Sequence, residues 1–338
     1  MPQGTAPGRT PHIRGFLYAS DACARIAQRL PVIAGSDSSV LIVGETGTGK
    51  EICAQALHYL SRRADGPWVA VNCAAVPVEL IESELFGHVK GAFTTAHSSR
   101  HGLVKEAEGG TMFLDDIDCL PLLAQGKLLR FLQQQEYRPV GCNTVQRSDV
   151  RVIAASNRDL RVMVKQNAFR QDLYFRLNVL PVALPPLRER REDIALLAEH
   201  FVRQFDQARG GDGRRLSAQA LQKLLAYDWP GNVRELRHVI ERSVLLAAGA
   251  RIEADDIAID PALDADAQAE APDPAGESFQ AAKKRVVERF ERQYIETLLA
   301  LHHGNLTHAA HAAKKNRRAF FELVRKHQID TRRFNDSP

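Results

Sequence analysis

Eight residues in the first sixth of the chain have the types and spacing that bind phosphate. They match the pattern GxxxxGK and read Gly44-Glu45-Thr46-Gly47-Thr48-Gly49-Lys50-Glu51. An apolar run at 40–43 precedes them and a helical pattern follows. Backbone N–H groups and a helix N-terminus can then surround phosphate oxygens, and Lys50 can reach the outer phosphates. We predict a site for nucleotide phosphates here. The competing interpretation is a glycine turn with a surface lysine, and Glu51 occupies the position where a Mg²⁺-binding Ser or Thr is usual.

Two adjacent carboxylates, Asp115 and Asp116, end a second apolar run that begins at Thr111. In phosphoryl transfer one such carboxylate holds Mg²⁺ and its neighbour orients or activates the attacking water, so we assign Asp115 to the metal and Asp116 to the water. Asn157 follows a third apolar run, where its amide can hydrogen-bond a phosphate or the water. Each feature alone is compatible with a polar turn. Together with the loop at 44–51 they indicate a nucleotide site.

These groups require a scaffold that brings the ends of several strands together. The apolar runs at 40–43, 112–114 and 150–155 are short and are separated by helical patterns. This alternation predicts a mostly parallel sheet covered by helices, an α/β fold. After residue 184 the segments 193–207, 217–227 and 232–248 are typical of amphipathic helices. Ser217 and Asn232 stand where N-caps belong.

The charge is segregated along the later part of the chain. Residues 253–277 contain nine Asp and Glu and no Lys or Arg, a composition typical of an extended acidic linker. Residues 279–338 reverse the sign, with 13 Lys and Arg against 6 Asp and Glu. A small basic module is therefore expected to follow the linker.

The basic module has the pattern of a helix, a tight turn and a second helix. A long amphipathic helix is predicted over 279–301, and a break near Gly304 precedes a small-residue helix and then a cationic one. Cationic residues at the start of such a helix read base edges and phosphates in the major groove, which makes DNA the expected partner. The competing interpretation is a solvated basic hairpin, and the spacing of the nearby histidines disfavours a metal site. The candidate DNA-binding residues are Thr307, Lys314, Lys315, Asn316, Arg317, Arg318, Arg325 and Lys326.

Composition excludes several classes of protein. The 338 residues are 44% hydrophobic and 25% charged, with a formal net charge of +4, which excludes a disordered or fibrous chain. No window approaches the roughly 18 consecutive apolar residues of a membrane span. The five cysteines are odd in number and lack CxxC spacing, so neither a disulfide framework nor a zinc site is indicated. We expect a cytoplasmic protein with reduced, mostly buried thiols and no membrane partner.

Further motifs give the chain a resemblance to a known family. They are Glu84-Leu85-Phe86-Gly87-His88, Gly91-Ala92-Phe93-Thr94-Thr95-Ala96, the stretch 184–193 and Trp229-Pro230-Gly231-Asn232-Val233-Arg234-Glu235-Leu236. With the nucleotide motifs, they resemble the bacterial enhancer-binding proteins, the AAA+ ATPases that activate sigma-54 RNA polymerase. The resemblance covers about residues 15–258 and resumes in the C-terminal module, which resembles a Fis-type helix-turn-helix.

The resemblance implies a domain organisation. The expected fold is a doubly wound αβα P-loop domain with an all-α lid, plus a small all-α helix-turn-helix domain. The expected boundaries are a flexible tail at 1–14, the AAA+ α/β domain at 15–184, the helical lid at 185–258, the acidic linker at 259–277 and the DNA-binding domain at 278–338. Only about fourteen residues precede the AAA+ core, so we expect no N-terminal regulatory domain.

The resemblance also implies residue roles that spacing alone does not supply. Asn72 corresponds to a residue that restrains the catalytic carboxylate, Asn157 to the first sensor and Arg234 to the second. Arg170 and Arg176 correspond to arginines that reach into a neighbouring subunit's site, although each arginine without the family would be taken for a surface residue. Such finger arginines, which act on the site of another subunit, imply a homo-oligomer, from a dimer to a hexameric ring. A hetero-oligomer is also compatible with this role. Glu51 is usual in this family.

Two residues depart from the family pattern. Asp116 replaces a catalytic Glu and is one methylene shorter, so the carboxylate has to reach about 1.5 Å further or act through a shifted water. Thr95 replaces the second glycine of the GAFTGA motif that contacts sigma-54, and a β-branched residue disfavours φ > 0 and close approach. Phe93 and Thr94, the residues expected to touch sigma-54, are retained.

Two functions are consistent with these observations. The first is an ATP-dependent transcription activator that binds upstream DNA and remodels sigma-54 RNA polymerase to open promoters. The second is a DNA-binding regulator of the same AAA+ family that has lost sigma-54 remodelling and uses nucleotide to control assembly. Thr95 and Asp116 are the sequence features that favour the second.

Overall fold

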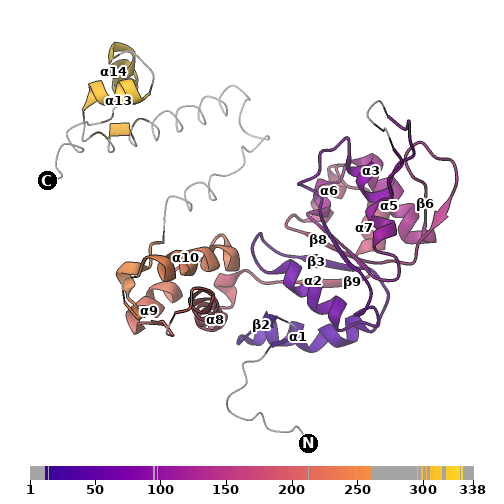
Figure 1. Ribbon diagram of the computed structural model, residues 1–338, viewed down its shortest axis with the longest axis horizontal. Helices are drawn as coiled ribbons and strands as arrows, with labels where there is room; N and C mark the ends of the chain where they lie inside the picture. Colours follow the sequence, from indigo (N-terminus) through magenta and orange to yellow (C-terminus); the bar gives the residue numbers. More distant parts are fainter. Residues whose placement is uncertain are drawn as a thin grey trace, which may run out of the picture. The chain divides into compact units, whose positions relative to one another are not determined.

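A computed structural model gives the structure of the protein (Figure 1). It describes residues 12–13, 15–93, 96, 98–211, 213–247 and 249–259, and in the C-terminal part 295, 298–299, 302, 305–313, 317–327 and 329. The chain divides into two compact units, Met1–Asp260 and Pro261–Pro338. Most of the predicted tail at 1–14 and of the predicted acidic linker lies outside the described residues.

A five-stranded parallel sheet forms the centre of the first unit. Its strands in spatial order are β4, β5, β8, β3 and β9, and every neighbouring pair is parallel. Their bounds are β3 Val40–Val43, β4 Trp68–Asn72, β5 Thr111–Asp115, β8 Arg151–Ser156 and β9 Leu180–Ala183. The predicted α/β class is confirmed. Because the strands are parallel, their carboxyl ends share one edge of the sheet.

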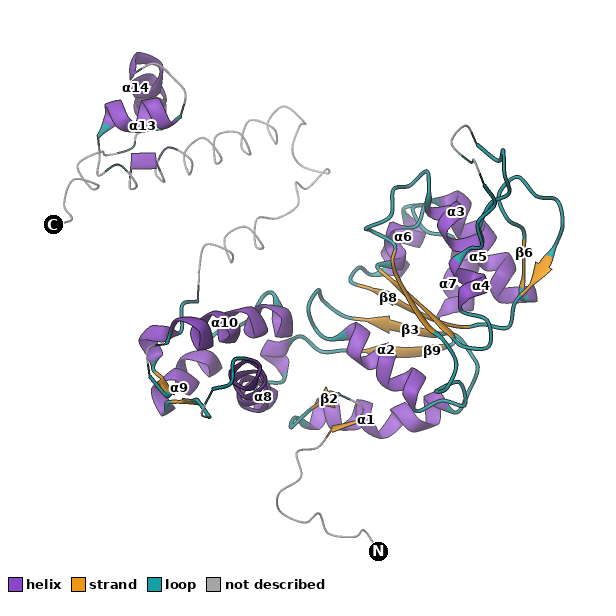
Figure 2. Cartoon of the chain, in the orientation of Figure 1, coloured by secondary structure: helices purple, strands orange, loops and turns teal. Residues whose placement is uncertain are grey.

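Helices cover both faces of this sheet (Figure 2). Alternate residues of β3 point to opposite faces, so Val40 and Ile42 pack with one group of helices and Leu41 with the other. The first group is α1 Asp21–Ala34 and α2 Lys50–Tyr59. The second group is α3 Ile81–Phe86, α4 Leu103–Glu106, α5 Leu122–Gln134, α6 Leu160–Lys165 and α7 Gln171–Leu177. Burial on both faces explains why the strands are continuously apolar in sequence.

Short elements complete the α/β part. The antiparallel pairs are β1 His12–Ile13 with β2 Phe16–Leu17, and β6 Glu136–Tyr137 with β7 Gln146–Arg147. Two 3-10 turns are η1 Ile117–Cys119 and η2 Leu187–Glu189. The first of these turns follows directly on the paired carboxylates, and the second begins the lid.

The lid is helical, as the periodicity predicts. It contains α8 Glu192–Ala208, α9 Ala218–Ala226 and α10 Asn232–Leu246, with the parallel pair β10 Arg215–Leu216 and β11 Arg251–Ile252 and the turn η3 Ala254–Asp256. Its core surrounds the fully buried Trp229. Ser217 caps α9, since its hydroxyl accepts the Ala220 N–H at 3.1 Å. The prediction that Asn232 caps α10 is wrong, because the N-cap is Gly231 and the Asn232 side chain bonds elsewhere.

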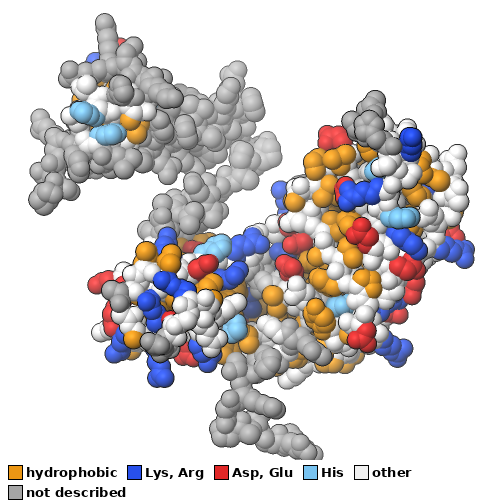
Figure 3. Space-filling view, viewed as in Figure 1, with side chains coloured by type: hydrophobic (Ala, Val, Ile, Leu, Met, Phe, Trp, Pro, Cys, Tyr) orange, Lys and Arg blue, Asp and Glu red, His pale blue; other side chains and the backbone are white. Residues whose placement is uncertain are grey.

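The C-terminal unit contains α13 Leu306–Ala312 and α14 Arg317–Lys326. Ile295, Leu299, Ala309, Phe320 and Val324 are among the residues that form its small buried core. The helix predicted over 279–301 lies mostly outside the described residues. Histidines are visible on one face of this unit (Figure 3). The His302 and His308 rings are 6.3 Å apart. No group of three metal-ligating side chains occurs within the described part of the chain.

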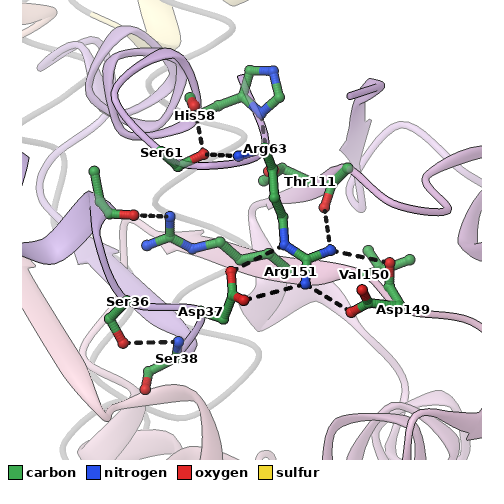
Figure 4. A network of polar contacts seen from close by, with 12 residues as sticks. Ser36, Asp37, Ser38, His58, Ser61, Arg63, Thr111, Asp149, Val150 and Arg151 are labelled. Carbon is green, nitrogen blue, oxygen red and sulfur yellow. Dashed lines mark hydrogen bonds and ion pairs between the residues drawn. The ribbon is translucent and has the colours of Figure 1, made fainter. Parts of the chain in front are cut away.

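Two arginines fasten the amino-terminal edge of the sheet (Figure 4). Arg151 is buried and donates to the carbonyls of Ile33 at 2.9 Å and Ala34 at 3.0 Å, which end α1. Arg63 bridges the carboxylates of Asp37 at 3.0 Å and Asp149 at 2.7 Å. Arginine suits this position because its planar group donates in several directions at once. These contacts anchor the edge opposite to the one at which the candidate site lies.

Most of the cysteines are buried, as expected from the sequence. Cys23, Cys53 and Cys73 are buried, Cys142 is half-buried and Cys119 is exposed, and all five are free. Burial raises the pKa of the Cys53 thiol to about 12, which keeps it protonated. Among the described helices, none has the length and apolar character needed to cross a membrane.

Candidate nucleotide-binding site

The predicted nucleotide motifs meet at the carboxyl edge of the sheet. The loop at 44–49 follows β3, Asn72 ends β4, Asp115 ends β5 and Asn157 directly follows β8. Since β3 and β5 both neighbour β8, the phosphate-binding loop and the paired carboxylates lie on either side of the Asn157 strand. The sequence predicted this gathering for the P-loop, the paired carboxylates and Asn157, whereas Asn72 was assigned only from the family resemblance.

Glycines shape the loop at 44–49, called the P-loop below. Gly47 and Gly49 have φ of +79° and +100°, conformations that favour glycine. Gly49 is the N-cap of α2 and supplies no side chain to the first N–H groups of the helix. Thr48 closes the turn by donating its hydroxyl to the Glu45 carbonyl at 2.8 Å. A helix N-terminus without a side-chain cap, placed after a left-handed turn, suits an anion such as phosphate.

Lys50 is buried within the loop. Its Nζ donates to the carbonyls of Gly44 at 3.0 Å and Glu45 at 3.2 Å. Desolvation by burial lowers the pKa of Lys50, and the nearby charges of Asp115 and Asp116 oppose that shift. Glu51 is exposed and accepts a hydrogen bond from Gln55 at 3.3 Å. Its charge is also one of the causes of the raised pKa of Asp115.

The two carboxylates differ in their surroundings. Burial, followed by the charge of Asp116, raises the pKa of Asp115. Asp116 adopts a left-handed backbone, φ 49°, and its Oδ2 lies 3.5 Å from Nδ2 of Asn72. The Asn72 Oδ1 accepts the N–H groups of Ala74 and Ala75, which fixes the orientation of its amide. Asn72 therefore faces Asp116 across adjacent strands.

Asn157 connects the carboxyl end of β8 to the P-loop. Its Nδ2 donates to the Thr46 hydroxyl at 3.1 Å. Sequence reasoning missed Asp118, which is buried and accepts the Ser156 hydroxyl at 2.8 Å. Asp118 ties the turn after Asp116 to the residue before Asn157, so it fixes the spacing between the carboxylates and the sensor position. Only its place two residues after the Asp pair hinted at this in the sequence.

Of the two candidate finger arginines, Arg170 is the N-cap of α7 and Arg176 lies within the helix. Arg170 is exposed and forms a two-point ion pair with Asp172, at 3.1 and 2.8 Å. Arg176 donates through Nε and Nη2 to the Leu132 carbonyl at 3.1 and 2.8 Å. Within the described part of the chain, neither arginine is hydrogen-bonded to the P-loop.

The lid touches the P-loop directly. The backbone N–H of Arg234 donates to the Gly47 carbonyl at 3.3 Å, and its side chain is exposed. The charge of Arg234 contributes to the lowered pKa of Lys50, which places it within electrostatic reach of the site. Sequence reasoning missed Arg188 and gave Asn232 the wrong partner, although both bond to P-loop residues.

The loop with the GAFT residues is built on three turns. Gly91 has φ +80° and donates its N–H to the Ala96 carbonyl, and Ala96 donates to the Phe93 carbonyl. The Phe93 ring lies 5.0 Å from the His88 ring, and His88 Nδ1 is 2.8 Å from the Ser83 hydroxyl. Thr94 and Thr95 lie outside the described residues, so the Thr95 departure has no structural account. Ala92 packs against Gly141 of the neighbouring hairpin.

The candidate DNA-binding residues are described only in part. Thr307 on α13 and Arg325 and Lys326 on α14 are exposed. Arg317 and Arg318 begin α14, and nothing is described of their side chains. Lys314, Lys315 and Asn316 lie outside the described residues.

Comparisons with known proteins show which family the chain is related to. The family described as the sigma-54 interaction domain matches residues 16–183, and the AAA+ ATPase lid domain matches residues 188–273. The regulatory protein AtoC of Escherichia coli is 45% identical over 318 residues, which cover 93% of this chain and 68% of AtoC. The regulator NtrC of Azospirillum brasilense is 42% identical over 327 residues, covering 90% of this chain and 68% of NtrC.

A solved structure agrees with these matches. The crystal structure of NtrX from Brucella abortus in complex with ADP is similar with a TM-score of 0.68 and 33% identity, and the match covers 93% of this chain and 70% of that one. The αβα sheet, the helical lid and the nucleotide motifs thus occur together in proteins related over nearly the full chain. The chain therefore belongs to the sigma-54-dependent transcription activators and carries a nucleotide-binding AAA+ domain of that family.

Proposed function

We propose that the protein hydrolyses ATP at the P-loop and uses the energy to move the loop at 86–96 against sigma-54 RNA polymerase. Its C-terminal helices bind upstream DNA and bring the ATPase to the promoter. The observation that carries this proposal is the contact of Asn72 with Asp116. It connects the candidate catalytic carboxylate, which follows β5, to Asn72 at the end of the edge strand β4.

The chain's own residues supply phosphate binding. The N–H groups of the P-loop and of the first turn of α2 surround the β- and γ-phosphates, and Lys50 adds a cation. Lys50 exchanges its bonds to the Gly44 and Glu45 carbonyls for phosphate oxygens, a short movement for a flexible side chain. Asn157, held at the Thr46 hydroxyl, faces the same group of phosphates.

Asp115 fits a divalent cation. Its pKa is raised by burial and by Asp116, so a nearby Mg²⁺ would relieve the cost of keeping its carboxylate ionised. Asp115 would hold Mg²⁺ together with phosphate oxygens, and the ion would neutralise charge on the phosphates. Glu51 is exposed and bonded to Gln55, and it is not a ligand in this proposal.

Asp116 acts as the base in hydrolysis. It accepts a proton from a water whose oxygen bonds to the γ-phosphorus while the bond to the β,γ-bridging oxygen breaks, giving ADP and phosphate. Asn72 holds the Asp116 carboxylate at 3.5 Å and restrains it until polymerase is engaged.

Assembly completes the site. Arg170 and Arg176 reach the γ-phosphate of a neighbouring subunit in a homo-oligomer, from a dimer to a hexameric ring. To do so Arg170 has to leave Asp172, and Arg176 has to leave the Leu132 carbonyl. The exposed position of Arg170 suits the first of these movements.

The deciding experiment is transcription in vitro with sigma-54 polymerase, comparing wild type, Thr95→Gly and Lys50→Ala. We expect ATP-dependent open complexes with the wild type, at least as many with Thr95→Gly, and none with Lys50→Ala. ATP hydrolysis without open complexes in the wild type, restored by Thr95→Gly, would instead favour the regulator that has lost remodelling. Retained turnover in Lys50→Ala would overturn the assignment of the site.

A further inference from the structure

P-loop residues 45–48 lie against two segments of the lid, η2 with the residues after it and the loop that leads into α10. Glu45 accepts two N–H bonds from Arg188, at 2.8 and 2.5 Å. Asn232 donates through Nδ2 to the Thr46 carbonyl at 3.0 Å and to Glu45 Oε2 at 3.2 Å. These three side chains, Glu45, Arg188 and Asn232, are called the latch below.

Asn232 connects both lid segments to the P-loop. It is fully buried, and its Oδ1 accepts the backbone N–H of Leu187 at 2.7 Å. Its backbone has φ 53°, a conformation that asparagine tolerates better than most residues. A single amide therefore holds η2, the start of α10 and the Thr46 carbonyl together, which explains why it does not cap its own helix.

The backbone makes a second set of contacts at the same place. The N–H groups of Val233 and Arg234 donate to the Gly47 carbonyl at 3.0 and 3.3 Å, so the P-loop satisfies the open N-terminus of α10. A Cβ on Gly47 would lie 2.2 Å from the Gly231 carbonyl oxygen. The two glycines therefore allow loop and lid to approach closely.

A further arginine of the lid, Arg190, bonds to the next carbonyl of the P-loop. The buried Arg190 donates to the Thr48 carbonyl at 2.7 Å. The carbonyls of Thr46, Gly47 and Thr48 are thus all bonded to the lid. A carbonyl shares its rigid peptide plane with the N–H of the next residue. The lid therefore holds the N–H groups of Gly47, Thr48 and Gly49 in one arrangement, because their peptide planes cannot rotate without losing such a bond.

We propose that Glu45, Arg188 and Asn232 are positioning residues that keep the P-loop organised for nucleotide phosphates through its contact with the lid. The inference rests on the assignment of ATP to the P-loop in the proposed function. Arg188 also neutralises Glu45, whose carboxylate would otherwise repel phosphate. The low pKa of Glu45, caused first by its hydrogen bond from Arg188, agrees with this pairing.

The test compares nucleotide affinity in four full-length proteins: wild type, Arg188→Ala, Glu45→Gln and the double variant. A fluorescent ADP analogue reports the dissociation constant, and thermal unfolding without nucleotide reports stability. Arg188→Ala should raise the dissociation constant about tenfold, the loss expected for a charge-assisted hydrogen bond. In the Glu45→Gln background, Arg188→Ala should raise the dissociation constant less than about threefold. The effects of two substitutions are not additive when the two residues interact directly.

Arg191→Ala is the matched control. Arg191 is similarly exposed and lies in the same segment, but it pairs with Asp228 and the Leu225 carbonyl within the lid. It should bind nucleotide as the wild type does. Arg188→Lys keeps the charge and should recover part of the affinity, and steady-state kinetics of Arg188→Ala should show a larger change in KM than in kcat.

The outcomes separate the latch from the nucleotide site. Wild-type affinity in Arg188→Ala would overturn the latch, as would an equal loss in Arg191→Ala or full additivity in the double variant. Failure of the wild type to bind the ADP analogue would overturn the nucleotide site itself. In that case Lys50→Ala and Arg188→Ala would both be indistinguishable from wild type.

Discussion

At the scale of single residues, Asp115 and Asp116 are neighbours with different environments. Asp115 is half-buried with a raised pKa, whereas Asp116 faces Asn72 at a distance that is long for a hydrogen bond. The raised pKa means that the folded protein favours protonated Asp115. Its contribution to stability is present at acid pH and is lost as the pH rises through the folded pKa.

Asp115→Asn should therefore stabilise the protein while abolishing hydrolysis. Near pH 7 we expect a melting temperature higher by about 2 °C, because the cost of ionising a half-buried carboxylate is removed. The gain should shrink as the pH falls below the raised pKa of Asp115. Differential scanning calorimetry between pH 4 and 8, with exposed Asp65→Asn as control, tests this. A destabilised Asp115→Asn at neutral pH would contradict the electrostatic account.

Asp116→Glu restores the longer carboxylate. The extra methylene should bring the carboxylate nearer to the attacking water, raising the rate of ATP hydrolysis severalfold, about 1 kcal/mol of barrier. Turnover measured at saturating ATP checks this. An unchanged or lower rate would mean that the site has adapted to Asp116.

At the scale of elements, the GAFT loop rests on the hairpin of β6 and β7. Gly141 lies in that hairpin with φ +78°, and a Cβ there would be 2.7 Å from the Cβ of Ala92. The N–H of Val89 also donates to the Val140 carbonyl at 3.1 Å. The hairpin thus sets the position from which the loop extends.

Gly141→Ala should uncouple hydrolysis from activation. The clash displaces the base of the loop, so open-complex formation should fall about tenfold while ATP turnover stays within about twofold. Gly210→Ala is the control, because Gly210 has φ +69° but no atom within 4 Å of the added Cβ. Equal losses of activation in both variants would show that backbone strain alone is responsible.

Sequence patterns predicted the elements better than the contacts between them. β3 was predicted with its exact bounds, because an apolar run between a turn and a glycine loop leaves little choice. Asn232 was assigned to its own helix because capping is a local rule, whereas its partners Thr46 and Leu187 are 186 and 45 residues away. Asp118 and Arg188 were missed for the same reason, since their roles depend on which strands and turns become neighbours.

At the scale of the whole molecule, two units divide the proposed functions. The C-terminal unit carries the exposed cations Arg325 and Lys326 on α14, and its own small core holds that helix. We expect DNA affinity to reside in residues 279–338. A single module makes few contacts, so specific binding should require a dimer on an inverted repeat with half-sites about one helical turn apart.

Arg325→Gln should weaken binding to all DNA sequences alike. Loss of one phosphate contact should reduce the slope of log affinity against log salt by about one. Fluorescence anisotropy with specific and random duplexes over a range of salt measures this, and Lys223→Gln in the lid is a control with the same change of charge. A loss restricted to the specific duplex would move Arg325 from phosphate to base contact.

The junction between β9 and the lid limits how freely the lid can turn relative to the P-loop. Leu184 donates its N–H to the Val43 carbonyl at 2.8 Å, and a Cβ on Gly44 would lie 2.9 Å from the Leu184 carbonyl oxygen. The chain is therefore fastened to the P-loop strand up to residue 184, and Pro185 and Pro186 follow at once. Their rings fix φ near about −65°. The lid is thus joined to β9 through two residues with fixed φ, so the junction leaves few torsions about which the lid can turn relative to the P-loop.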